Sequence, residues 1–324
     1  MALSAIIIFI VFLAIYALIV VLDVIKAHKK GQKYKMSRFI TASLFILPAA
    51  ALAFFFVLLP IIYSLGYSFT NYDLFKPDKI KYAGLNNFAK AFKEIQAGGK
   101  LAYAIRNTAI FVVLVVPIQI GLALLLALFC NAKVKGNTIF KVCFFAPVVI
   151  SLTITSYLWS IILSENPDIG IFASIFTKLG LEPRFLSHPD YAMVWIVIAS
   201  AWQGCGYQML IFLSGLSGIR KDLYEAARMD GCNAFQRFFK VTLPGLKPTM
   251  LYILITVFIG ACRIMVQPML MVGYHDNAVT LSYYVYQQGV TMHFVGYSCA
   301  IALLMTIFIG TITFIQRKIL GEKK

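Results

Sequence analysis

The sequence predicts an all-α integral membrane protein with about seven transmembrane helices. Of its 324 residues, 60% are hydrophobic and 13% are charged, and the mean hydropathy is +0.83. This apolar content is well above that of ordinary water-soluble domains. The apolar residues form continuous runs of about 20, the length that a helix needs to cross a bilayer. Because the runs do not alternate between polar and apolar residues, as transmembrane β-strands do, we expect helices.

Seven runs reach this length. The first begins MALSAIIIFI, without the basic start or the small-residue cleavage site of a signal peptide. We therefore expect residues 1–38 to form an extra N-terminal transmembrane helix and a basic loop, followed by a transmembrane domain over residues 39–324. Arg263 interrupts the sixth run. The seven runs cover roughly residues 4–25, 39–63, 105–130, 142–163, 191–215, 248–271 and 296–316.

The distribution of lysine and arginine predicts the orientation in the membrane. If the basic block at 26–38 is cytoplasmic, that side of the bilayer carries 19 of the 29 basic residues and the opposite side carries nine. Basic residues favour the cytoplasmic side, so we expect a multi-pass plasma-membrane protein with its N-terminus outside and its C-terminus in the cytoplasm. This asymmetry explains most of the net charge of +16 without a nucleic-acid partner.

The sequence contains no pattern that predicts catalysis or cofactor binding. It has no G-x-x-x-x-G-K-[ST] phosphate loop, so we do not expect this chain to hydrolyse ATP or to be an enzyme. The four histidines and six cysteines do not have metal-ligand or disulfide spacings. Asp23 is the only acidic residue in a predicted span, which argues against a self-powered carrier, since carriers place ionisable groups there.

One polar stretch, 220–247, separates two apolar runs on the predicted cytoplasmic side. Asp222 and Glu225 have capping-box spacing, and Gly231 is the residue type that ends a helix. Asn233 then predicts a second N-cap, for a short helix over AFQRFFK that we expect to stop before Pro244. By residue type alone, this pair of helices is equally consistent with a docking surface and with an interfacial loop that packs on its own spans.

The spacing within this stretch resembles a known family. Glu225-Ala226-Ala227, then Gly231, then Val241-Thr242-Leu243-Pro244 is similar to the EAA loop of ATP-binding-cassette (ABC) importer permeases, here at residues 225–244. The fuller pattern around it, from LYEAA to LPGLKP, is typical of the carbohydrate branch and resembles the maltose and glycerol-phosphate permeases. The resemblance runs from about residue 39 to 316. It includes FILPA at 45–49, GLNNF at 84–88, RNT at 106–108, TLSYYVYQQ at 280–288 and GYSCAIA at 296–302.

The resemblance implies a six-helix permease core, with residues 1–38 outside it. It further implies a second permease in a heterodimer, two ATPase subunits that bind ATP and Mg, an extracytoplasmic solute-binding protein, a sugar substrate and contact with membrane lipid. The EAA helix would dock in a cleft of the ATPase, with Ala226 and Ala227 in close contact and Gly231 as the corner. The implied coupling residues are Glu225, Ala226, Ala227, Asp230, Gly231, Leu243 and Pro244.

The resemblance also implies substrate contacts from the helices on either side of the EAA loop. Aromatic and amide side chains suit sugar rings and hydroxyl groups. Trp202 and Tyr207 equally fit membrane-interface anchors. Arg263 either faces the path, favouring an anionic substrate, or extends to the outer interface. The implied substrate-path residues are Trp202, Gln203, Gly204, Tyr207, Gln208, Arg263 and Gln267.

The sequence leaves open the identity of the sugar, the contacts of one outer segment and an alternative function. The chain has Met265-Val266 and Gly273-Tyr274-His275 where the family usually has Phe-Asp and Gly-Gly-Pro, so the identity of the sugar does not follow from the resemblance. The outer segment NFAKAFKEI would place Phe88, Ala91, Phe92 and Ile95 on one helical face, against lipid or a binding protein. The alternative function from another class is a membrane receptor or assembly protein that uses the same fold without transport.

Overall fold

The computed structural model describes residues 36–131, 136–273 and 278–320, and within these ranges the fold is helical without a β-strand. A single isolated bridge joins Thr70 and Tyr82. The all-α prediction is therefore confirmed. The predicted first span, 4–25, and most of the basic block lie outside the described residues.

Four helical segments of the described chain are long and apolar enough to cross a membrane. Two further pairs of helices pass the same test only as bent units, so the described residues supply four spans, or up to six. The count of seven stays a prediction. The four segments are α2 with η1 and α3 (Met36–Ala53, Phe54–Leu58 and Leu59–Ser68), α5 (Lys100–Asn131), α9 (Pro189–Ser217) and α16 (Val295–Leu320).

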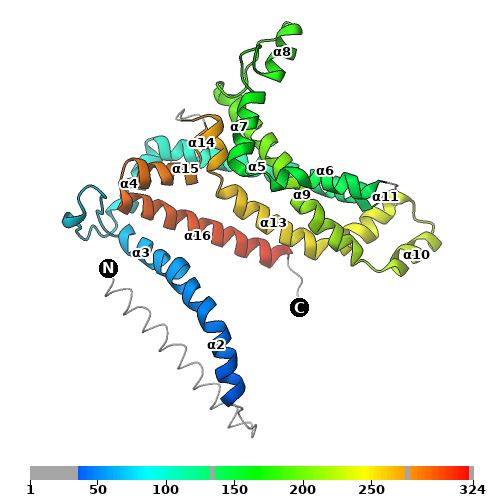
Figure 1. Ribbon diagram of the computed structural model, residues 1–324, viewed down its shortest axis with the longest axis horizontal. Coiled ribbons are helices and arrows are strands. Elements are labelled where there is room, and N and C mark those ends of the chain that lie inside the picture. The colour runs from blue at the N-terminus through cyan, green and yellow to red at the C-terminus, as the bar shows by residue number, and fades with distance from the viewer. Residues whose placement is uncertain (1–35, 132–135, 274–277, 321–324) are drawn as a thin grey trace.

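The centre of the bundle is the pair α5 and α9, which run along each other (Figure 1). α6 (Asn137–Val149) packs on α9, α13 (Lys247–Cys262) packs on α5, and α3 packs on α16. Of the four spans, only α9 is more than half buried. The buried share of its apolar stretch is 56%, whereas that of the other three spans is 11% to 22%. So much outward-facing apolar surface suits lipid or another membrane subunit.

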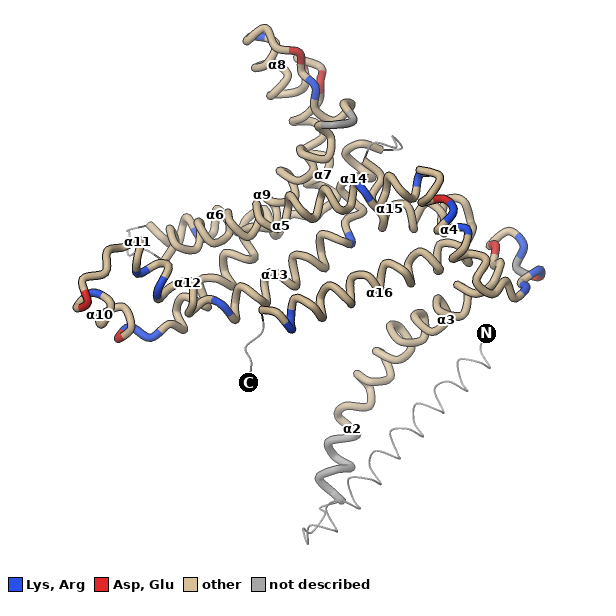
Figure 2. Tube along the Cα trace, turned by 180° about the vertical axis from the view of Figure 1, so that it is seen from behind, with Lys and Arg blue, Asp and Glu red and all other residues tan. Residues whose placement is uncertain are grey.

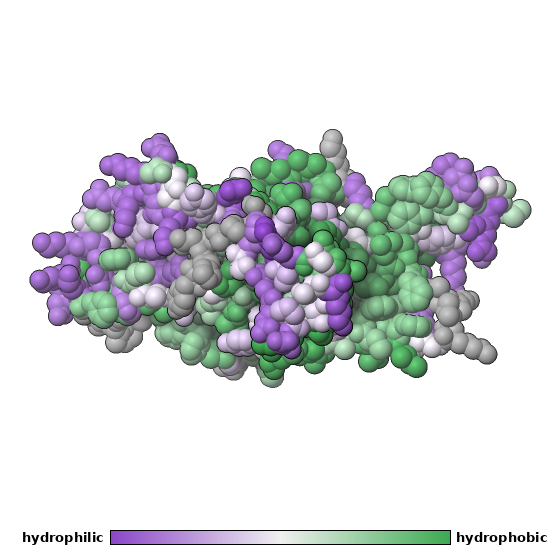
Figure 3. All heavy atoms as spheres, turned by 90° about the horizontal axis from the view of Figure 1, so that it is seen from above, coloured by the Kyte–Doolittle hydropathy of each residue, from purple (hydrophilic) through white to green (hydrophobic). Residues whose placement is uncertain are grey.

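Charged residues gather at the two ends of the bundle and on the projecting arm that carries α8 (Ile171–Lys178), and a few lie at the C-terminal end of α16 (Figure 2). One end carries α10 (Lys221–Met229), and the other carries α4 (Asn86–Gln96) with the loop that follows α3. From above, hydrophilic atoms cover both ends and the central projection, with hydrophobic surface between them (Figure 3).

The run predicted as one span at 142–163 is two helices that meet at 97°. α6 ends at Val149, the next two residues are extended, and α7 (Leu152–Ile162) starts after Ser151. The carbonyl of Ile150, freed by the break, accepts a hydrogen bond from Gln203 Nε2 at 3.2 Å. Because this partner lies 53 residues further along the chain, the apolar run gives no local sign of the break.

The predicted span 248–271 is also wrong in its last third. α13 ends at Cys262, Arg263 is the C-cap, and a separate short helix, α14 (Val266–Met271), follows. Thr280 Oγ1 donates to the Ile264 carbonyl at 2.6 Å, so the chain itself satisfies this break as well. Arg263 therefore lies at the end of a span rather than inside one.

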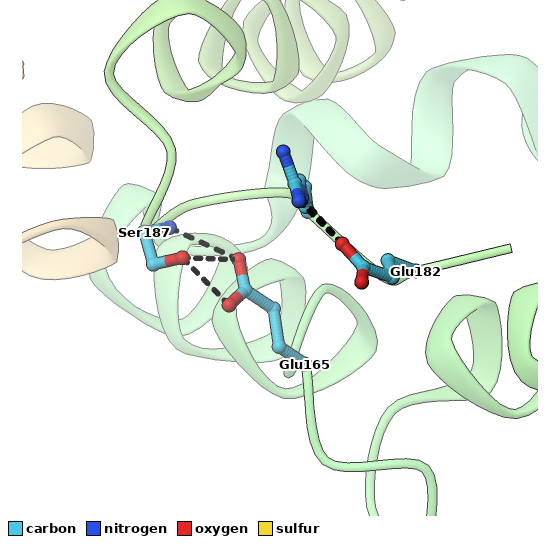
Figure 4. Close-up of polar contacts among 4 residues, drawn as sticks. Glu165, Glu182 and Ser187 are labelled. Carbon is cyan, nitrogen blue, oxygen red and sulfur yellow. Dashed lines mark hydrogen bonds and ion pairs between the residues drawn. The ribbon is translucent and has the colours of Figure 1, made fainter.

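A side projection formed by α7 and α8 (Ile171–Lys178) extends away from the bundle (Figure 1). Glu165 joins the two ends of this arm by accepting hydrogen bonds from Phe185 N at 2.8 Å and from the N–H and hydroxyl of Ser187 (Figure 4). Burial raises the pKa of Glu165, but these hydrogen bonds outweigh it and leave the pKa below its usual value. The exposed pair of Glu182 and Arg184 lies nearby.

The outer helix α4 is covered by its own chain more than the sequence indicated. Ala91 is fully buried and Ile95 packs with it against a cluster that contains Tyr284 and Tyr297. Phe92 is 56% exposed, whereas Phe88 and Ile95 are half-buried. The predicted contact of this face with lipid or a binding protein is therefore wrong for Ala91, which the periodicity alone could not assign to the inside.

The close crossing of α6 and α9 generates a test of the fold. A Cβ added at Gly206 would lie 2.2 Å from the Phe144 carbonyl oxygen, whereas one at Gly121, also inside a span, would meet nothing within 4 Å. We expect Gly206→Ala to lower the stability by about 1–3 kcal/mol, the usual range for overpacking. Thermal unfolding in detergent should show a lower Tm for Gly206→Ala and no loss for the control Gly121→Ala. Equal Tm values would contradict the crossing.

Candidate functional site

A pocket of about 740 Å³ lies inside the bundle, between α5, α9, α13, α14, α16 and α15 (Leu281–Tyr286). Three of the predicted substrate-path residues line it: Gln208, Arg263 and Gln267. The remaining wall is mostly apolar, with a few serine and threonine hydroxyl groups. A partly polar cavity of this size inside an apolar bundle is the natural candidate for a binding site.

Four buried glutamines bracket the pocket and are called the glutamine network here: Gln119, Gln203, Gln208 and Gln267. Gln119 donates to Gln208 across α5 and α9 at 3.1 Å. Gln267 donates to Gln203 across α14 and α9 at 3.3 Å and accepts from Ser200. Each amide is thus paired, as buried polar groups must be in an apolar bundle.

Two predicted substrate-path residues support the pocket wall without lining the pocket. Gln203 does not line the pocket; it joins Gln267 to the Ile150 carbonyl at the α6–α7 break. Gly204 provides space, because a Cβ there would lie 2.2 Å from Gln119 Nε2. These two residues therefore influence the shape of the pocket through the side chains that they contact.

The two predicted aromatic residues lie on other surfaces of α9. Trp202 is 43% exposed and forms an edge-to-face contact with Trp159 at 5.8 Å between ring centroids. Tyr207 is 50% exposed and lines a different pocket, of about 590 Å³, between α6, α9 and α13. The structure therefore brings neither ring to the large pocket.

Arg263 supplies a positive charge at the pocket. It is exposed, it follows the last turn of α13, and no carboxylate among the described residues forms an ion pair with it. The C-terminal end of a helix is a favourable place for a cation. The guanidinium group keeps its hydrogen-bonding capacity for solvent or a ligand.

The sequence reasoning missed several polar residues of the pocket wall. Gln119 carried a usable signal, since an amide within an apolar span is rare and costly unless it has a partner. Thr256 and Thr306 carried none, because each hydroxyl donates to a backbone carbonyl one turn earlier, a bond that threonine makes in any helix. The missed pocket residues include Gln119, Ser200, Thr256, Ser282 and Thr306.

The cytoplasmic stretch begins with α10, and its end is as predicted. Gly231 has φ +75°, Gly231 N donates to Arg228 O at 3.0 Å, and Cys232 N donates to Ala227 O at 2.9 Å. These paired bonds form the Schellman turn that glycine favours. The predicted start differs, because Arg220 is the N-cap and Asp222 pairs with Arg220 instead of capping the helix.

The second helix of the stretch starts as predicted and ends later. Asn233 and Gln236 form a reciprocal capping box at α11 (Ala234–Arg237). The helix does not stop before Pro244, however. A π-turn, η3 (Phe238–Thr242), leads into α12 (Leu243–Gly245), with Leu243 N donating to Phe238 O. The wider turn explains how the helix accommodates a proline that an α-turn would reject.

The predicted coupling residues divide into an exposed and a covered set. Glu225, Ala226 and Asp230 are exposed, whereas Ala227 is 8% exposed and packs towards its own chain. Tyr224 on the same helix shares a hydrogen bond of 3.0 Å with Thr242. α10 is therefore held against η3 on one side and presents Glu225 and Ala226 on the other. Leu243 is half-buried and Pro244 is exposed.

Comparisons with known proteins agree with this fold. Residues 91–324 match the family described as binding-protein-dependent transport system inner membrane component. A probable ABC transporter permease protein, YesP of Bacillus subtilis, is 32% identical over 81% of this chain and 84% of its own. The lactose transport system permease protein LacF of Rhizobium radiobacter is 31% identical over 87% and 94%.

An arabinooligosaccharides transport system permease protein, AraP of Bacillus subtilis, is 31% identical over 76% of this chain and 79% of its own. In fold, the chain is similar to a crystal structure of a bacterial ABC transporter involved in the import of the acidic polysaccharide alginate. The TM-score is 0.76 with 20% identity, covering 88% of this chain and 96% of that chain.

The family match covers most of the chain, includes the stretch with the EAA spacing, and agrees with relatives that are permease subunits rather than ATPases or enzymes. The chain thus belongs to the family of inner membrane components of binding-protein-dependent transport systems, as a permease of the ABC importer type.

Proposed function

We propose that this permease forms, with a second permease, the path of an oligosaccharide through an ABC importer, and that the large pocket is part of that path. Support comes from the position of the pocket in mid-bundle and from the amide and hydroxyl groups on its wall. Such groups suit sugar hydroxyls. Relatives whose names include arabinooligosaccharides and lactose favour the same substrate class.

ATP and Mg would bind to two separate ATPase subunits, and these subunits would bind the EAA loop. The support is the exposed surface of α10, where Glu225 and Ala226 face outward. Leu223, at 50% exposure, and Met229, at 89%, add apolar surface beside them. Apolar contacts with a charge at their edge are typical of a protein interface. An extracytoplasmic solute-binding protein would deliver the sugar at the opposite end of the bundle.

The proposed orientation places α4 outside the cell and α10 in the cytoplasm. Phe92→Cys on α4 and Met229→Cys on α10 both replace exposed residues. In intact cells, a membrane-impermeant maleimide should label Phe92→Cys only, and permeabilisation should expose Met229→Cys. The native chain, with its six cysteines, is the control and should stay unlabelled before permeabilisation. Labelling of Met229→Cys in intact cells would reverse the proposed orientation.

Coupling through the EAA loop has its own test. Glu225→Lys reverses the exposed charge, and Gly231→Pro removes the positive φ that the Schellman turn requires. We expect both variants to insert but to lose sugar uptake and binding-protein-stimulated ATP hydrolysis. Glu182→Lys, at the exposed ion pair of the side arm, is the matched charge reversal and should keep both. Normal uptake by the two loop variants would show that the loop does not couple.

Arg263 leads us to propose further that the substrate is anionic, since this arginine lines the pocket without a carboxylate partner among the described residues. A charge-assisted hydrogen bond contributes about 1.5–3 kcal/mol, so Arg263→Gln should reduce uptake of alginate trisaccharide about 10- to 100-fold. Arg184→Gln on the arm is the control. Uptake of neutral arabinotriose should not depend on Arg263. Unchanged uptake of the acidic sugar by Arg263→Gln would remove the charge from the path.

A further inference from the structure

Glu94 lies outside the pocket but bonds to three helices that line it. The residue belongs to α4, at the proposed outer end of the bundle. Its Oε1 accepts a hydrogen bond from the Tyr284 hydroxyl at 2.8 Å and from Leu101 N at 3.1 Å. Its Oε2 accepts from the Tyr297 hydroxyl at 2.5 Å. These three donors come from α15, α5 and α16.

The surroundings of this carboxylate make the contacts strong. Tyr284 and Tyr297 are only 3% and 4% exposed, and Leu101 is 1% exposed. Leu101 N is in the first turn of α5, where N–H groups lack partners within the helix and a negative charge is favourable. Lys90 Nζ lies 4.3 Å from the centre of the Tyr297 ring and adds a positive charge nearby. Hydrogen bonds to an ionised group are the strongest of their kind.

The three bonded helices also supply pocket residues. α5 contributes Gln119, α15 contributes Ser282, and α16 contributes Met305 and Thr306. Other hydrogen bonds between described residues join these helices in pairs. Asn107 and Thr108 tie α5 to the start of α15, and Ser298 ties α16 to α15.

The Glu94 carboxylate thus accepts hydrogen bonds from α5, α15 and α16 together. We infer that Glu94 is a positioning residue that fixes the outer ends of these helices as one unit, so that three walls of the pocket keep their spacing while the importer cycles. Glu94 acts through Tyr284, Tyr297 and the start of α5, and it does not touch the substrate. The effect on uptake rests on the proposed function, whereas the effect on helix order does not.

The charge of Glu94 persists at neutral pH. Burial raises its pKa, but hydrogen bonds from Tyr297, Tyr284 and Leu101 N, with the charge of Lys90, bring the pKa below its usual value. A lowered folded-state pKa means that the stabilisation is present above the unfolded-state pKa and is lost only as the pH falls through the folded-state pKa. Acidification would also titrate Glu165 and the other carboxylates, so substitution is the cleaner perturbation.

The test compares Glu94→Gln with Glu182→Gln in the complete importer reconstituted in lipid. Hydrogen–deuterium exchange should rise at least about tenfold in Glu94→Gln at the starts of α5, α15 and α16, because charge-assisted bonds to each are lost. α13 should not change. Uptake of arabinotriose or alginate trisaccharide should fall about tenfold, while maximal ATP hydrolysis stays within about twofold. Glu182→Gln, on the exposed arm, should match the wild type in all readouts.

The inference is overturned if faster exchange is confined to α4 in Glu94→Gln, if uptake equals that of the wild type, or if uptake and ATP hydrolysis fall in parallel. Where Glu94→Gln does not assemble, the double variant Tyr284→Phe and Tyr297→Phe decides by uptake and by exchange in α15 and α16, since it keeps both rings and removes both hydroxyl donors. The bond to Leu101 N remains in that variant, so α5 should not change. A wild-type importer that takes up neither sugar would count against the proposed substrates, and the exchange data would still decide the role of Glu94.

Discussion

The structure depends on one constraint, that every backbone group freed by a helix break inside an apolar bundle must find its hydrogen bond within the chain. Lipid offers no donor or acceptor to replace it. The break between α6 and α7 leaves the Ile150 carbonyl free, and Gln203 donates to it from α9. The break after α13 leaves the Ile264 carbonyl free, and Thr280 donates to it from the start of α15. Both breaks are therefore fixed by residues on other helices.

The same constraint connects the helix breaks to the pocket. Gln203, which satisfies Ile150, also accepts from Gln267 on the pocket wall, and Gln267 accepts from Ser200. A wall residue is in this way held by a chain of bonds that ends at a broken helix. Arg263 differs from these amides because no ion pair with a described carboxylate holds it. The glutamines thus define the shape of the pocket, and the arginine supplies a charge that a ligand can use.

The sequence predicted what depends on local pattern. Apolar runs of spanning length located α5, α9 and α16, and the Gly231 turn and Asn233 cap followed from residue types that act over three or four positions. It could not predict the breaks in the 142–163 and 248–271 runs, because the stabilising bonds come from residues distant in sequence. The burial of Ala91 and Ala227 was missed for a related reason, since periodicity shows which residues share a face but not what covers that face.

For the pocket, the resemblance pointed to Gln208, Arg263 and Gln267 but equally to Trp202 and Tyr207, which share α9 with Gln208. A helix of 29 residues has several lateral surfaces, and only the packing of α5 and α14 decides which one faces inward. The family resemblance indicated which part of the chain contacts the substrate path, and the structure showed which face of that part lines the pocket.

The path from the EAA loop to the pocket is short and almost wholly helical. Tyr224 on α10 bonds to Thr242 in η3, the helix continues through Pro244, and α13 begins two residues after α12 ends. α13 has 16 residues, a length of about 24 Å at 1.5 Å per residue, and its C-cap is Arg263 at the pocket.

Gly245 and Leu246 form the bend of 67° between the two helical runs, and Leu246 is fully buried. Because a packed helix moves as a rigid body more readily than it deforms, a displacement of α10 by the proposed ATPase partner would be transmitted to α13 through this buried corner. Arg263 lies at the far end of α13, so the proposed substrate contact lies at one end of this helix and the bend that leads back to the proposed ATPase contact on α10 lies at the other.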